Sequence, residues 1–188
     1  METSLSRRKS IRLEGYDYSQ PGMYFVTVCV QGKKHLLGEI EMAKMHLSEL
    51  GRKVWETWEE LPKRYRNIEL DEGVVMPNHF HGIIVIKNVG APLAGARSER
   101  AGARPAPTLG SVIGAFKSMT ARQFLLSSKK NPSQLWQRNY YERVIRNEKE
   151  LFETRQYIQQ NPLKWELDPE NPAFNATTVG APLVGARG

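Results

Sequence analysis

Apolar positions along the chain predict four strands and three helices. Runs of β-branched and aromatic residues predict strands over 23–30, 68–76, 80–86 and 135–145. Apolar residues spaced three and four apart predict helices over 46–61, 108–126 and 148–161. Pro62 and Pro162 end the first and last of these helices, and Asn147 with Glu150 resembles a capping box at the start of the last one.

The order of these elements is strand, helix, strand, strand, helix, strand, helix. This order predicts an α+β fold, a ferredoxin-like sandwich with a central antiparallel sheet, helices on one face and an extra C-terminal helix. Only the turn Met76-Pro77-Asn78 separates the second and third strands, so we expect them to pair as an antiparallel hairpin. We expect one folded domain over 21–168, preceded by a basic arm over 1–20.

Two segments stand outside this order. The nonapeptide at 89–97 recurs at 179–187 with eight of nine residues identical, and both copies are rich in Gly, Ala and Pro. Such a composition is typical of flexible chain rather than of a packed core. We therefore expect a surface loop over 88–107 and a disordered tail over 169–188, and the sequence assigns no role to the repeat.

The charge and the cysteine content narrow the class of protein. A net charge of +7 in 188 residues and a pI near 9.6 favour a polyanionic partner, with nucleic acid as the first candidate. Cys29 is the single cysteine and lies in an apolar run, which excludes a disulfide framework and a cysteine-rich zinc site. No apolar run reaches the length of a membrane span, and no apolar core follows Arg7-Arg8-Lys9. We expect a cytoplasmic protein that does not bind membranes.

The candidate chemistry begins at His79-Phe80-His81, where the Pro-Asn turn meets the third strand. Side chains alternate along a strand, so His79 and His81 point to one face, about 6–7 Å apart, and Phe80 points to the other. Two imidazoles on one face can hold a divalent metal. The pattern is short and needs a partner elsewhere in the chain; the alternative is a pair of surface histidines at a strand start.

The last predicted helix carries Tyr157 and Asn161 one turn apart on one side. If His79 and His81 bind a metal, Tyr157 is a candidate nucleophile toward a phosphodiester and Asn161 a candidate oxygen ligand. Mixed imidazole and carbonyl ligation suits Mg²⁺ or Mn²⁺ better than a structural zinc ion. Alternatively, Tyr157 packs at the edge of the apolar face, as most such tyrosines do.

Three separate motifs in this order resemble one family. The segments at 76–81, 136–141 and 157–162, with further likeness at 12–18 and 22–27, resemble the REP-associated tyrosine transposases, a branch of the single-tyrosine HUH transposases. The resemblance spans about 8–168. It implies a ferredoxin-like nuclease that nicks and rejoins single-stranded hairpin DNA through a 5′-phosphotyrosine, with Tyr157 as nucleophile and His79, His81 and Asn161 as metal ligands. The loop at 88–107 is longer than the family pattern needs.

Other residues are candidates for contact with DNA. Tyr140 and Tyr141 compete with Tyr157 as nucleophile, and on a strand they would point to opposite faces. Either can instead pack in the protein or stack on unpaired bases. Five basic side chains are candidate phosphate contacts, although most such groups are merely solvated: Lys117, Arg122, Arg138, Arg143 and Arg146.

Two further interpretations stay open at this point. The chain can be a catalytically silent nucleic-acid-binding regulator with the same fold, or a metal-dependent hydrolase that uses water and keeps Tyr157 for packing. The intact set of His79, His81, Tyr157 and Asn161 favours the transposase. The sequence leaves open whether the protein is a monomer or a homodimer.

Overall fold

The computed structural model describes residues 20–87, 107–128, 135–168 and 171. The basic arm at 1–19, both copies of the nonapeptide and nearly all of the predicted loop and tail lie outside the described residues. Asn171, inside the predicted tail, is buried and donates its backbone N–H to the carbonyl of Asp168 (2.8 Å). The packed part of the chain therefore includes Asn171.

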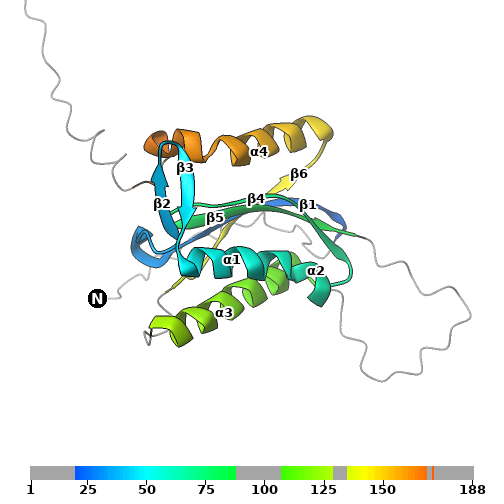
Figure 1. Ribbon diagram of the computed structural model, residues 1–188. Coiled ribbons are helices and arrows are strands. Elements are labelled where there is room, and N and C mark those ends of the chain that lie inside the picture. Colours follow the sequence, from blue (N-terminus) through cyan, green and yellow to red (C-terminus); the bar gives the residue numbers. More distant parts are fainter. Residues whose placement is uncertain (1–19, 88–106, 129–134, 169–170, 172–188) are drawn as a thin grey trace, which may run out of the picture.

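Four antiparallel strands form the central sheet, in the order β4-β5-β1-β6 (Figure 1). Their bounds are β1 Gly22–Cys29, β4 Ile68–Val75, β5 His79–Ile86 and β6 Tyr141–Ile145. β4 and β5 pair as the predicted hairpin across the Pro-Asn turn, and Met76 closes it by donating its N–H to the carbonyl of His79. The predicted α+β fold with a central antiparallel sheet is confirmed.

Helices cover both faces of the sheet. The helices α1 Glu49–Glu59 and α3 Leu109–Ser128 lie on one face, and α4 Glu148–Gln160 lies across the other (Figure 1). The predicted extra C-terminal helix is therefore α4, and it covers the face that the other two leave open. Asn147 caps α4 as predicted, since its side chain accepts the backbone N–H of Glu150 (2.9 Å). Shorter turns complete the domain: η1 Gln31–Lys33, α2 Leu61–Arg64 and η3 Pro162–Leu167.

Alternating side chains on the sheet supply two separate cores. Phe80, Ile84 and Ile86 of β5 belong to the larger core, under α1 and α3. Ile83 instead joins Phe25 and the α4 residues in a smaller core. A Cβ on Gly82 would lie 2.5 Å from a ring carbon of Trp58, so glycine at this position lets the indole pack directly against β5. Dense packing behind β5 holds the strand that carries both histidines.

Two parts of the fold differ from the sequence prediction. A hairpin, β2 Gly38–Glu41 and β3 Lys44–Leu47, occupies a region with no predicted strand, and it displaces the start of the helix predicted from residue 46 to residue 49. Its turn uses positive φ at Met42 (48°) and Ala43 (60°) instead of the usual Asn-Gly, so the sequence carries no hairpin signal.

The fourth strand is shorter than predicted. Only 141–145 pair with β1 as a strand, and the chain over 135–140 is irregular. In that stretch the carbonyl of Leu135 accepts the N–H of Gln31, and the N–H of Gln137 donates to the carbonyl of Cys29. The segment before β6 thus extends the β1 edge through single hydrogen bonds rather than a regular ladder.

Candidate active site

His79 and His81 lie on the face of the sheet that α4 covers, as the strand alternation predicts. Their side chains are 0% and 3% exposed, and their Nε2 atoms are 2.9 Å apart. Phe80, between them, packs against Trp58 and Phe116 on the opposite face. The alternative of two surface histidines is therefore wrong.

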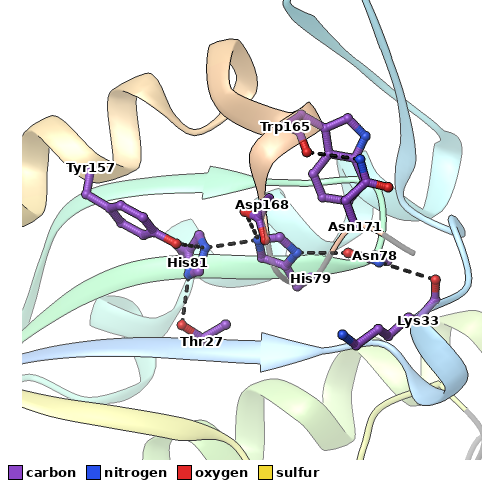
Figure 2. A network of polar contacts seen from close by, with 9 residues as sticks. All are labelled: Thr27, Lys33, Asn78, His79, His81, Tyr157, Trp165, Asp168 and Asn171. Atoms are coloured by element: carbon purple, nitrogen blue, oxygen red, sulfur yellow. Dashed lines mark hydrogen bonds and ion pairs between the residues drawn. The ribbon is translucent and has the colours of Figure 1, made fainter. Parts of the chain in front are cut away.

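Hydrogen bonds behind the two rings fix how they face one another (Figure 2). Asn78 donates its Nδ2 to the carbonyl of Lys33 (3.2 Å), which turns its Oδ1 toward Nδ1 of His79 (2.8 Å). Nδ1 of His79 is therefore the donor, and its Nε2 keeps a lone pair. Nδ1 of His81 contacts Oγ1 of Thr27 (2.8 Å), its direct partner across β1 and β5. This is the outer-shell support that orients metal-binding histidines.

Burial keeps both imidazoles neutral. It lowers the pKa of His79 to about 3, with a further contribution from the charge of Lys33. Burial, and then the neighbouring His79, hold the pKa of His81 well below its ordinary value. Neutral imidazole is the form that ligates a metal ion.

Tyr157 approaches this pair from α4. Its hydroxyl lies 3.5 Å from Nε2 of His81, and the two ring centroids are 5.3 Å apart. Phe25 of β1 stacks on His81 (5.2 Å) and meets the Tyr157 ring edge-on (5.9 Å). Tyr157 is nevertheless 45% exposed, so its hydroxyl stands between a buried histidine pair and solvent.

Asp168 places a carboxylate oxygen beside this group, and the predicted ligand Asn161 has a buried amide oxygen at the end of α4. Asp168, which follows η3, places Oδ2 3.9 Å from Nε2 of His79, and the ligand atoms of His79, His81 and Asp168 all lie within 4.8 Å of one another (Figure 2). Asn161 caps α4 one turn beyond Tyr157 and is 3% exposed. Its Oδ1 is buried and makes no hydrogen bond within the part of the chain that the structure describes.

These donors fit a hard divalent cation. Neighbouring ligand atoms of an octahedron with ligand distances of 2.0–2.1 Å lie about 2.9 Å apart, which is the separation of the two Nε2 atoms. The Asp168 carboxylate beside them adds an oxygen ligand of the kind that Mg²⁺ and Mn²⁺ prefer, and Asn161 stays a predicted second one. The group can therefore bind a metal ion.

Sequence analysis missed three of these residues. Asp168 lies in a turn after the last helix, where no periodicity points to it. Thr27 belongs to an apolar strand and becomes relevant only because β1 pairs in this register with β5. Asn78 was identified only as part of the turn, although its position directly before His79 was a signal for a side chain that orients the ring.

The prediction that the two competing tyrosines point to opposite faces assumed a strand through both, but β6 begins only at Tyr141, and Tyr140 and Tyr141 both line a cavity beside Tyr157. Tyr140 packs against the larger core, whereas Tyr141 stands beside Phe25 on the α4 face with ring centroids 6.4 Å apart. Tyr157 is the tyrosine whose hydroxyl contacts His81. The geometry therefore favours Tyr157 as the nucleophile.

The predicted DNA contacts divide by position. Arg143, on β6, extends over the Phe25 ring (5.9 Å) and donates to Oγ1 of Thr154 on α4 (2.7 Å), which places it beside the site. Arg138, in the irregular segment before β6, and Arg146, directly after β6, are both exposed. Lys117 and Arg122 belong to α3, on the other face of the sheet, and the ammonium group of Lys117 donates to backbone carbonyls of 137–139. Contact with phosphate stays a prediction for all five.

The pH dependence of stability follows from the two buried histidines. Their folded-state pKa values lie below the unfolded value near 6.5, so below that pH the unfolded chain binds protons that the folded chain excludes. The free energy of unfolding of the metal-free protein is therefore expected to be highest above pH 6.5 and to fall as the pH decreases below 6.5. Urea titrations in EDTA between pH 5 and 8 measure this. The double variant His79→Asn/His81→Asn should flatten the profile; an equal slope in both proteins would contradict the assignment.

The chain resembles known proteins in sequence and in fold. It is 38% identical over 171 residues to an uncharacterised protein of Haemophilus influenzae, covering 87% of this chain and 93% of that protein. The solved structure of a REP-associated tyrosine transposase bound to a REP hairpin superposes with a TM-score of 0.51 at 18% identity, covering 92% and 90% of the two chains. No protein-family model matches the chain. In the described segments, no helix is both long and apolar enough to cross a membrane.

Proposed function

This chain belongs to one family with the Haemophilus influenzae protein and has the fold of a REP-associated tyrosine transposase, and on that premise we propose that it is a metal-dependent transposase. In this proposal the chain nicks and rejoins single-stranded hairpin DNA with Tyr157 as nucleophile. The observation that carries the proposal is the Tyr157 hydroxyl, 3.5 Å from Nε2 of His81, at a buried, oriented and neutral histidine pair.

The proposed step exchanges one phosphoester bond for another. The phenolic oxygen of Tyr157 attacks the phosphorus, the phenol proton passes to solvent, and the bond from phosphorus to the 3′-oxygen breaks. The products are a 5′-phosphotyrosine and a protonated 3′-hydroxyl, and the reverse attack by a 3′-hydroxyl rejoins a strand. No external energy source is needed because the covalent intermediate keeps the ester bond.

His79, His81, Asn161 and Asp168 are the proposed ligands. A bound Mg²⁺ or Mn²⁺ supplies charge that offsets the negative charge of the scissile phosphate and of the phosphorane-like transition state. The chain contributes the fixed orientation of its ligands through Asn78 and Thr27. Phe25 holds the Tyr157 ring against His81 by an edge contact.

One experiment separates this proposal from the other two functions. A radiolabelled hairpin oligonucleotide with single-stranded flanks, incubated with the protein and Mn²⁺, should run as a protein–DNA adduct on a denaturing gel. A silent DNA-binding regulator gives neither cut nor adduct, and a hydrolase that uses water gives cut DNA without adduct. Either of those outcomes would exclude the tyrosine mechanism.

The catalytic helix is tethered to the sheet of its own chain. Arg155, two residues before Tyr157, donates Nε to Oδ1 of Asp71 (2.7 Å) and Nη2 to Oδ2 (2.5 Å). This two-point contact lowers the pKa of the Asp71 carboxyl, which lies where the β4–β5 register shifts. Gln159 adds a bond to Glu72 (2.9 Å). Because this tether holds Tyr157 beside His81 of the same chain, we propose that the enzyme acts in cis.

Loss of this tether should slow the reaction more than it weakens DNA binding. Arg155→Ala and Asp71→Ala are each expected to lower the rate of adduct formation by about tenfold to a hundredfold. A displacement of the nucleophile by about 1 Å is enough to cause a loss of that size. The double variant should be no slower than either single one. Lys149→Ala, which removes an exposed pair with Glu153 on the same helix, is the control. Equal losses in DNA affinity and rate would contradict a positioning role.

The substrate preference follows from the proposed reaction. A hairpin with single-stranded flanks should bind better than a blunt duplex of the same sequence, because an unpaired strand can bend its phosphate into the site. Binding should weaken as salt increases, since contacts between basic side chains and phosphates release counterions. Fluorescence anisotropy at several salt concentrations measures both effects. Equal affinity for hairpin and duplex would favour the regulator.

A further inference from the structure

A cavity of about 520 Å³ opens beside Tyr157, next to the histidine pair. Its walls come from β1, β6, α4 and the irregular segment before β6, and they include Phe25, Tyr141, Arg143 and Tyr157. The volume lies within the range of sites that enclose a small organic group. Because three residues of the candidate active site, His81, Tyr157 and Asp168, also line the cavity, a group bound in it would lie adjacent to the phosphate under attack.

Aromatic rings form the apolar side of the cavity. Phe25 lies between Tyr141, at 6.4 Å edge-on, and Tyr157, at 5.9 Å edge-on. Tyr141 and Tyr157 are each 45% exposed, and both line the cavity. Half-exposed tyrosines beside a basic side chain such as Arg143 are the surface on which unpaired bases stack.

The polar side is built from an irregular segment that is held from behind. Gln137 and Asn139 line the cavity. The ammonium group of Lys117, on α3, donates to the carbonyls of Gln137 (2.7 Å), Arg138 (2.9 Å) and Asn139 (3.4 Å). Lys117 reaches this segment from the opposite face of the sheet, and its burial lowers its pKa. This cation fixes the backbone from which the Gln137 and Asn139 side chains extend. Nε2 of Gln137 also donates to the carbonyl of Val30 (3.4 Å), which orients that amide and leaves its oxygen and its second N–H for a ligand.

Amide side chains suit the edge of a base. Each offers a donor pair and an acceptor, the complement of the donors and acceptors along an unpaired base edge. A site that combines ring faces for stacking with fixed amides for an edge discriminates between bases, whereas rings alone do not. This combination is what separates the cavity from a general groove for single-stranded DNA.

We propose that this cavity binds one unpaired nucleobase of the DNA strand, adjacent to the phosphate that Tyr157 attacks. Tyr141 stacks on the base, Gln137 and Asn139 bind its edge, and Arg143 neutralises the neighbouring backbone. Lys117 is a positioning residue that holds the backbone of 137–139, from which Gln137 and Asn139 extend. The proposal deepens the proposed function and rests on it for the identity of the strand.

The first test measures stacking without cleavage. The full-length Tyr157→Phe protein selects, by filter binding, from a pool of hairpin oligonucleotides whose single-stranded flanks are randomised. The recovered sequence is then synthesised with 2-aminopurine at each flank position in turn. Quenching at one position on binding is expected, together with its loss and an affinity lower by about fivefold or more after Tyr141→Ala. Phe152→Ala removes another exposed ring, on α4, that does not line the cavity, and it should change neither signal.

The second test measures base discrimination. Sequencing the adducts that the unmodified protein forms with the same pool should show a preference for one base at the quenched position. Gln137→Ala/Asn139→Ala should flatten that preference, and Lys117→Met should weaken it, with thermal unfolding checked for each variant. Equal quenching at all positions, or a preference unchanged in these variants, would overturn the proposal.

The two tests distinguish failure of the cavity proposal from failure of the proposed function. If adducts form but 2-aminopurine is quenched at no position, the base site is wrong and the proposed transposase activity still stands. A quenched position without any adduct supports the base site in a protein that binds DNA and does not cut it. If no hairpin from the pool binds at all, both proposals fail.

Discussion

Replacing Tyr157 with phenylalanine is expected to abolish covalent capture of DNA and to leave the fold intact. The substitution removes one hydroxyl from a side chain that is 45% exposed, and the ring keeps its contacts with Phe25 and His81. Adduct formation should fall by more than about a thousandfold, as expected when a nucleophile is removed. Denaturing gels with the labelled hairpin measure the adduct, and anisotropy measures binding, which should change by less than about threefold.

Two matched variants make this prediction specific. Tyr140→Phe and Tyr141→Phe remove the hydroxyls of the competing tyrosines and should keep adduct formation. If the Tyr157→Phe protein still forms adduct at an undiminished rate, the nucleophile is one of these two. Digestion of the adduct and mass spectrometry of the DNA-linked peptide identify it directly.

Replacing either buried histidine is expected to abolish cleavage together with metal binding. His79→Ala and His81→Ala each remove one of two nitrogen atoms that lie 2.9 Å apart, and one remaining imidazole does not hold the ion at the phosphate. Isothermal titration calorimetry with Mn²⁺ gives a readout that does not depend on DNA. Cleavage should stop in EDTA and return on addition of Mn²⁺ or Mg²⁺; full activity in EDTA would exclude the metal role.

Replacing the side chains that orient the two imidazoles should weaken metal binding less than replacing a histidine. Asn78→Ala and Thr27→Val leave both nitrogen ligands and remove only the atoms that orient them, so Mn²⁺ affinity should fall by about tenfold to a hundredfold. Excess Mn²⁺ should restore cleavage in these variants and not in His79→Ala. Asn161→Ala and Asp168→Asn should each weaken Mn²⁺ binding if both supply oxygen ligands. His46→Ala, an exposed histidine on β3, is the control and should bind Mn²⁺ like the unmodified protein.

Local patterns in the chain determined much of the fold and half of the candidate site. Alternation along β5 put His79 and His81 on one face and Phe80 on the other, because successive side chains of a strand must point to opposite sides. The helical period placed Asn161 one turn beyond Tyr157, and Asn147 marked the start of α4. These features depend only on residues a few positions apart, which is why the sequence alone was sufficient for them.

Contacts between distant residues were decided only by the tertiary structure. The pairing of Thr27 with His81 depends on the register of β1 against β5, and the bond between Arg155 and Asp71 spans 84 residues. Asp168 meets His79 only because η3 returns the chain across the site, and Lys117 reaches the segment at 137–139 from the other face of the sheet. None of these leaves a periodic trace, since each is the result of how whole elements pack. The sequence by itself identified His79, His81, Tyr157 and Asn161 as candidates because each stands in a local pattern; the packing of α4 and η3 against the sheet brought Tyr157 and the unpredicted Asp168 to the histidines.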